Sequence, residues 1–73
     1  MSFKLKFSGD LCHARGKMGL TQMQAADRLS MALRTYQYIE SGHKIPTLQN
    51  FFKLINLFEL DANDYRHLFD EDA

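Results

Sequence analysis

The chain has 73 residues, of which 45% are hydrophobic and 25% charged, and its formal net charge is zero. This length allows one domain with one core, and the hydrophobic content excludes a disordered chain. The single cysteine, Cys12, excludes an internal disulfide and is typical of the reducing cytoplasm, and no apolar run approaches the roughly 18 residues of a membrane span. We therefore expect one cytoplasmic domain over residues 1–73, without membrane contact.

The charges are distributed unevenly along the chain. Residues 1–58 carry eight basic and three acidic side chains, a net charge of +5, whereas residues 59–73 carry one basic and six acidic side chains, a net charge of −5. A basic body with an acidic end is compatible with a surface that faces nucleic acid, although most charged faces are only solvated.

The spacing of apolar residues predicts helices along nearly the whole chain. From Phe7 to Met18 an apolar residue recurs every three or four positions, and Gly19 is typical of a helix C-terminus. Residues 1–6 would precede this first helix as an arm. Only the segment 3–7, in which apolar and polar residues alternate, has a pattern that also fits a strand.

A second helix is expected from Thr21 to about Leu29. The Thr21 side chain can cap it while Gln24 reaches back, as in a capping box, and Leu20 with Ala25 fits a hydrophobic staple.

A third helix is expected over about 32–41, after a two-residue turn at 30–31. Gly42 would end this helix, and residues 43–46 would form a loop because the residue before a proline avoids helical backbone. The inward side chains of the third helix would be Tyr36 and Ile39.

Two more helices are expected towards the C-terminus. Thr47 would cap the fourth, whose broad apolar face consists of Leu48, Phe51, Phe52, Ile55 and Phe58. Asp61 would cap a short fifth helix, and residues 70–73 would form an acidic tail. The inward residues of the fifth helix would be Tyr65, Leu68 and Phe69. The core should depend most on Leu29, Ile39, Leu48 and Phe51.

Two short helices joined by a turn fit a helix-turn-helix but also any other helical hairpin. The more specific signal is a set of positions in one register: 19–22 (GLTQ), Ala26, Leu29, 39–42 (IESG) and 46–48 (PTL). This register resembles the Cro and CI repressor family of helix-turn-helix domains, also called the Xre type, over about residues 7–69. The resemblance implies an all-α, compact five-helix, lambda-repressor-like DNA-binding domain whose helices 2 and 3 form the helix-turn-helix.

Three positions depart from the pattern of that family. The turn has Ser30 where the family usually has a left-handed glycine, which would cost about 1–2 kcal/mol. Ala32 replaces the usual serine or threonine cap, a loss of about 0.5–2 kcal/mol. Leu33 replaces a polar residue at the tip of the recognition helix. The first two departures lower the expected stability, and the third changes the expected type of base contact.

The resemblance also implies which residues contact DNA. The base-contacting positions are Ala32, Leu33, Arg34 and Tyr38. Arg34 is the leading candidate because its planar guanidinium matches guanine O6 and N7, whereas Leu33 would contact a thymine methyl group or simply be exposed. The phosphate-contacting positions are Thr21, Gln22, Thr35, Ser41, His43 and Lys44. Gln22 would lie at a helix N-terminus, where free N–H groups bind phosphate.

In this family an ion pair often joins the first helix to the end of the third, and the matching residues are Arg15 and Glu40. We expect Glu40 to orient the recognition helix, and a phosphate contact stays open for Arg15. No catalytic, metal-binding or cofactor-binding pattern is present, because the three histidines are scattered and Cys12 has no second cysteine at metal-binding spacing.

These features predict a sequence-specific, double-stranded-DNA-binding transcriptional regulator, a repressor rather than an enzyme, that needs no cofactor. It would bind as a homodimer because one helix reads few base pairs, with half-sites about 34–36 Å apart. The dimer contact would involve the fifth helix and residues 58–60. Two alternatives stay open: an antitoxin that also binds a toxin partner, and a protein-interaction module that has lost DNA binding. Salt-sensitive retention on duplex DNA would exclude the second of these.

Overall fold

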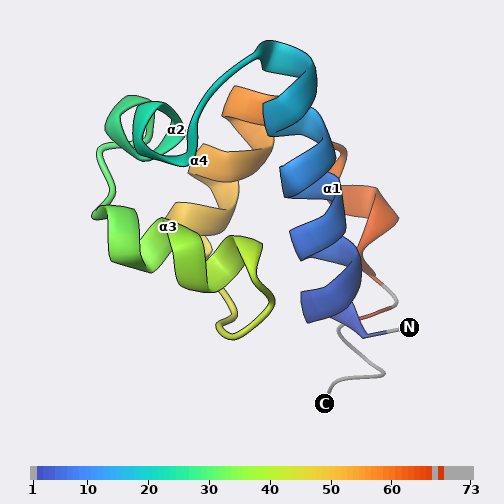
Figure 1. Cartoon of the computed structure of the whole chain (residues 1–73). Coiled ribbons are helices and arrows are strands. Elements are labelled where there is room, and N and C mark those ends of the chain that lie inside the picture. The colour runs from blue at the N-terminus through green and yellow to red at the C-terminus, as the bar shows by residue number, and fades with distance from the viewer. Residues whose placement is uncertain (1, 67, 69–73) are drawn as a thin grey trace.

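The computed structural model describes residues 2–66 and 68, which form four α-helices and a short 3-10 turn (Figure 1). The elements are α1 (Phe3–Met18), α2 (Gln22–Arg28), α3 (Leu33–Glu40), α4 (Leu48–Phe58) and the 3-10 turn η1 (Ala62–Asp64). The described residues include no strand, so the all-helical class is confirmed. None of their helices is long and apolar enough to cross a lipid bilayer.

The expected count of five helices is not confirmed, because the segment after Asp61 begins as the 3-10 turn η1. The Asp61 carboxylate accepts a hydrogen bond from the Asn63 N–H at 2.9 Å, as a cap would. The turn ends where Tyr65 is anchored to α1, since the Tyr65 hydroxyl donates to the carboxylate of Asp10 at 2.7 Å. The acidic tail, 70–73, and the expected inward residue Phe69 lie outside the described part of the chain.

Helix α1 begins at Phe3, so residues 3–6 form its first turns rather than an arm or a strand. Phe3, Phe7 and Leu11 are spaced four residues apart and are all buried. In this segment apolar and polar residues alternate, and large apolar residues also recur every four positions. Only the four-residue spacing, read as a helix, places Phe3, Phe7 and Leu11 on one face. Leu5 lies away from that face and is 63% exposed.

The boundaries of the helix-turn-helix agree with the predicted ones. Gly19 adopts a left-handed backbone, with φ of 70°, at the end of α1. The Thr21 hydroxyl accepts from the Gln24 N–H at 3.1 Å, and the Gln24 amide oxygen accepts from the Thr21 N–H at 2.9 Å, which confirms the capping box. Ser30 is left-handed, with φ of 51°, and Ala32 precedes α3 without a side-chain cap. Both expected departures are therefore present in the backbone.

One core joins all four helices and the segment after η1. Its buried members are Phe3, Phe7, Leu11, Ala25, Ala26, Leu29, Tyr36, Ile39, Phe51, Leu54, Phe58, Tyr65 and Leu68. At its centre is an aromatic cluster of Phe3, Phe7, Phe51 and Tyr65, with ring centroids 5.0–6.3 Å apart. Aromatic packing of this kind accounts for much of the stability of so small a domain.

Two residues expected on the inner face of α4 are exposed instead. Leu48 is 72% exposed and Phe52 50% exposed, so the prediction that Leu48 belongs to the core is wrong. The helix faces the core through Phe51, Leu54 and Phe58, whose spacing of three and four residues keeps them on one side. Leu48 and Phe52 are one turn apart and share a different face.

Within residues 2–66 and 68, the packing of the helices leaves one face of α3 exposed. Helix α1 packs against α3 and α4, and α2 packs against α3. In Figure 1, α3 (green) lies to one side of α1, and the C-terminal segment (orange to red) lies to the other. The outer surface of α3 is therefore not covered by the described part of the chain.

Candidate nucleic-acid interface

The outward face of α3 forms a continuous polar stripe. Arg34, Gln37, Tyr38 and Ser41 are exposed along it, spaced three and four residues apart as one helix face requires. The opposite face holds Tyr36, Ile39 and Glu40, all buried. The stripe is thus a rigid surface whose position is set by the core beneath it.

Arg34, at the N-terminal end of this stripe, lies beside Tyr38, one turn further along α3. The guanidinium carbon of Arg34 is 5.8 Å from the centroid of the Tyr38 ring, a cation–π geometry. The Tyr38 ring centroid is also 6.4 Å from that of the His43 ring, with the two rings tilted against each other. Contact with the Tyr38 ring restricts the motion of the Arg34 guanidinium without using its N–H groups. These donors therefore remain available for a planar, bidentate pair of hydrogen bonds to a ligand.

The other two expected base-contacting residues lie at the start of α3. Ala32 is exposed immediately before the helix. Leu33 is half-buried and packs against the core, so only part of its side chain is accessible. Thr35 is also half-buried. Compared with Arg34, these residues have less surface to offer a partner.

The turn after α3 brings three of the expected phosphate-contacting residues together. Ser41, His43 and Lys44 are all exposed. The Ser41 hydroxyl is 2.7 Å from His43 Nδ1, and the backbone N–H groups of His43 and Lys44 donate to the Tyr38 carbonyl at 2.9 and 3.2 Å. Gly42, with φ of 81°, makes this tight turn possible because a side chain is strained in that backbone.

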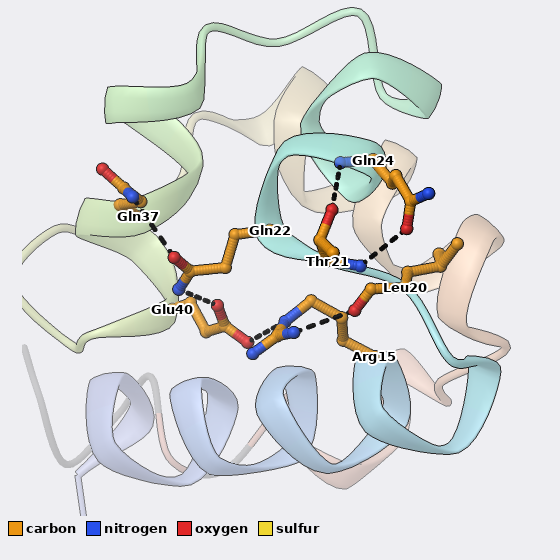
Figure 2. A network of polar contacts seen from close by, with 7 residues as sticks. All are labelled: Arg15, Leu20, Thr21, Gln22, Gln24, Gln37 and Glu40. Carbon is orange, nitrogen blue, oxygen red and sulfur yellow. Dashed lines mark hydrogen bonds and ion pairs between the residues drawn. The ribbon is translucent and has the colours of Figure 1, made fainter.

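An ion pair between Arg15 of α1 and Glu40 of α3 lies beneath the stripe (Figure 2). Arg15 Nε donates to Glu40 Oε1 at 2.8 Å, and Arg15 Nη1 donates to the Leu20 carbonyl at 2.9 Å. The Glu40 side chain is only 4% exposed and that of Arg15 20%. The hydrogen bond to Glu40 raises the pKa of Arg15 above its ordinary value. The pair therefore joins the first helix to the end of α3.

Gln22 extends this pair to α2, and its amide faces protein rather than pointing freely outward. Gln22 Nε2 donates to Glu40 Oε2 at 2.6 Å, and Gln22 Oε1 accepts from Gln37 Nε2 at 3.2 Å (Figure 2). The two oxygens of Glu40 thus have partners from α1 and α2. One N–H of the Gln22 amide has no bond in this network and remains available as a donor.

Gln37 is a site residue that the sequence analysis did not single out. It lies on the exposed stripe three residues after Arg34, and it also lies three residues before Glu40. Residues three apart are neighbours on a helix, so Gln37 lies between Arg34 and the Arg15–Glu40 ion pair. Its amide donates to Gln22 across the corner between α2 and α3. The remaining expected residue, Thr21, is exposed at the N-terminus of α2, where its hydroxyl already caps the helix.

We predict that Glu40→Gln destabilises the fold by about 1–3 kcal/mol, because Arg15 loses its charged partner in a largely buried place. Urea denaturation of parent and variant measures this difference. The matched control is Asp27→Asn, the same change at an exposed carboxylate of α2, which should alter stability by less than about 0.5 kcal/mol. Equal effects of the two changes would show that the pair does not hold α3.

Comparison with known proteins agrees with this arrangement. A Helix-turn-helix family model matches residues 13–64. The chain is also similar to the cryptic phage CTXphi transcriptional repressor RstR of Vibrio cholerae serotype O1 (strain ATCC 39315 / El Tor Inaba N16961), with 30% identity over 60 residues. That match covers 82% of this chain and 54% of the repressor, so the chain spans about half the length of this relative. No solved structure matches at a significant level. The chain therefore belongs to the helix-turn-helix family of the Cro/CI repressor type.

Proposed function

We propose that the chain is a sequence-specific, duplex-DNA-binding transcriptional repressor that reads the major groove with α3. The observation that carries this proposal is the exposed Arg34 guanidinium stacked on Tyr38, on a helix whose inner face is buried and whose end is held by Glu40. The similarity to a phage transcriptional repressor supports it. The protein acts in the cytoplasm by binding rather than by catalysis, and needs no cofactor.

Sequence is read by the four residues on the outer side and tip of α3. Arg34 donates two hydrogen bonds to the O6 and N7 atoms of a guanine, the commonest specific contact in the major groove. Tyr38, stacked against Arg34, contacts the neighbouring base or sugar. Ala32 and the accessible part of Leu33 contact thymine methyl groups, since both present only apolar atoms.

Phosphate contacts come from the two ends of the helix-turn-helix and fix its register on the duplex. Lys44, His43 and Ser41 hold the backbone beyond the C-terminus of α3. Gln22 contributes its remaining amide N–H at the start of α2, and the hydroxyl groups of Thr21 and Thr35 complete the set. These contacts strengthen binding to every sequence alike.

Selection of bound duplexes from a random pool, at a stated salt concentration, tests this function. We expect an enriched inverted repeat with a guanine in each half-site, the half-sites being about one helical turn apart as for two copies of a helix-turn-helix. A pool that stays random after repeated selection would contradict sequence-specific binding.

Lys44→Ala should weaken binding to all duplexes similarly and reduce the slope of log affinity against log salt by about one, because one fewer counterion is released. The salt dependence of the dissociation constant measures this. Lys17→Ala is the matched control, since Lys17 lines a groove on the side of α1 that faces residues 57–60. An unchanged slope in Lys44→Ala would place Lys44 away from the phosphates.

A further inference from the structure

The hydrogen bonds that run from Glu40 through Gln22 to Gln37 have a direction, which the carboxylate of Glu40 sets (Figure 2). A carboxylate accepts hydrogen bonds and does not donate them, so Gln22 turns its Nε2 towards Glu40, 2.6 Å away. The Oε1 atom of Gln22 then faces Gln37, and only Nε2 of Gln37 can donate to it, over 3.2 Å. One carboxylate therefore fixes the orientation of two successive amides.

The outer end of this series is the free edge of the Gln37 amide. Gln37 is exposed on α3, and within residues 2–66 and 68 no group donates a hydrogen bond to its Oε1. Figure 2 shows this oxygen pointing away from Gln22. One N–H of Gln37 Nε2 is also unused, because the other is bonded to Gln22. The exposed edge thus presents one acceptor and one donor side by side.

We propose that Gln37 is a fifth base-reading residue of α3, specific for adenine, and that Glu40 determines this choice through Gln22. The inference rests on the proposed function. In the major groove adenine presents the N6 amino donor beside the N7 acceptor, and an amide edge with one acceptor and one donor pairs with both. A reversed amide would present only its NH₂ group, whose two donors match the O6 and N7 acceptors of guanine. The direction of the series therefore selects adenine over guanine.

The place of Gln37 on α3 puts this adenine in the half-site that Arg34 reads. Three residues of an α-helix rise about 4.5 Å, and neighbouring bases of one strand are about 3.4 Å apart along the duplex. The adenine is therefore one or two base pairs from the guanine of Arg34. Gln22 already holds the inner side of the Gln37 amide, which reduces the entropy that the side chain loses when it binds a base.

Glu40→Gln should reverse the series while keeping its shape. Arg15 only donates hydrogen bonds, so the substituted amide keeps its oxygen towards Arg15 Nε and turns its NH₂ group towards Gln22. Gln22 then presents Oε1 to residue 40 and Nε2 to Gln37, and Gln37 in turn presents its NH₂ group to DNA. The preferred base at this position should therefore change from adenine to guanine, although residue 40 itself is buried.

Selection of bound duplexes with the parent and with Glu40→Gln, at equal salt, tests the inference. We expect the parent to prefer adenine over guanine by about 5- to 150-fold at this position, and the variant to prefer guanine there. Both proteins should keep the guanine read by Arg34. The variant lacks one negative charge, which raises its affinity for every duplex alike, so the readout is the ratio between bases. An unchanged preference for adenine in the folded variant would overturn the proposal.

Gln37→Leu keeps the test decisive if Glu40→Gln does not fold, because it leaves the pair of Arg15 and Glu40 in place. It should lower the preference for adenine by at least about five-fold and change the preference for the Arg34 guanine by less than about two-fold. The matched control is Asn56→Leu, which removes an exposed amide from α4 and should leave both preferences unchanged. Equal losses at both base pairs in Gln37→Leu would make Gln37 a structural link between α2 and α3 and overturn the proposal.

The parent selection separates this inference from the proposed function. An enriched Arg34 guanine with no adenine one or two base pairs away would overturn the inference and leave the proposed function standing. A pool that stays random would contradict both.

Discussion

Ile39→Ala is expected to remove about 2–5 kcal/mol from the free energy of unfolding. Ile39 is 2% exposed on the inner face of α3, so the change leaves a cavity beneath the recognition surface. Small domains have only about 5–15 kcal/mol in total, and each kcal/mol lowers the melting temperature of a domain this size by about 4–8 °C. Thermal and urea denaturation followed by circular dichroism measure the loss.

Leu48→Ala is the control for this prediction, because Leu48 is also a large aliphatic residue of a helix but is 72% exposed. It should change stability by less than about 0.5 kcal/mol. If Ile39→Ala is as stable as the parent, or if Leu48→Ala is equally destabilised, the described core is wrong.

Arg34→Ala is expected to cost about 1–3 kcal/mol of binding free energy on the selected duplex and to relax the preference at one base pair. The loss on a scrambled duplex should be smaller, because only the guanine contact depends on sequence. Titrations of both duplexes with parent and variant, at equal salt, measure the difference. The helical content of the variant should match the parent, since Arg34 is exposed.

Arg34→Lys separates the shape of the side chain from its charge. Lysine keeps the positive charge but lacks the planar fork, so this variant should bind the scrambled duplex like the parent while losing most of the preference for the selected one. Equal losses for Arg34→Ala on the two duplexes would instead make Arg34 a phosphate contact, and base reading would fall to Leu33 and Tyr38.

The features of the fold that could be predicted from the sequence are those set by local chemistry. The capping box of Thr21 and Gln24 and the left-handed Gly19 depend on residues close together in the chain, and both are present. The apolar periodicity was less decisive at the ends of helices. Phe3 joins the core and Leu48 does not, because where a helix meets its neighbours depends on the packing of the whole domain.

One further boundary had no signal in the sequence. Helix α4 ends at Phe58, and the residue that follows it, Glu59, has a left-handed backbone with φ of 55°. Glycine or asparagine is the usual residue at such a position. A glutamate there does not indicate the end of a helix, so this boundary could not be predicted from the sequence. The left-handed Ser30, by contrast, was expected because the family usually has glycine at that place.

The site could be predicted as a list of positions but not as a set of contacts. The resemblance to the repressor family indicated Arg15 and Glu40 as partners, and the structure brings them together. It did not indicate that Gln22 would bind Glu40 or that Gln37 would bind Gln22. Contacts between side chains of α2 and α3 depend on the angle between the two helices. The spacing of residues within each helix does not determine that angle.

The most direct test of sequence-specific DNA binding is the ratio of two affinities of the parent protein. The selected duplex and a scrambled duplex of the same length and composition are titrated at one physiological salt concentration. Electrostatic attraction to phosphates is the same for both, so only base reading by α3 separates them. We predict that the selected duplex binds at least about 10³-fold more tightly. Equal affinities would contradict the proposed function.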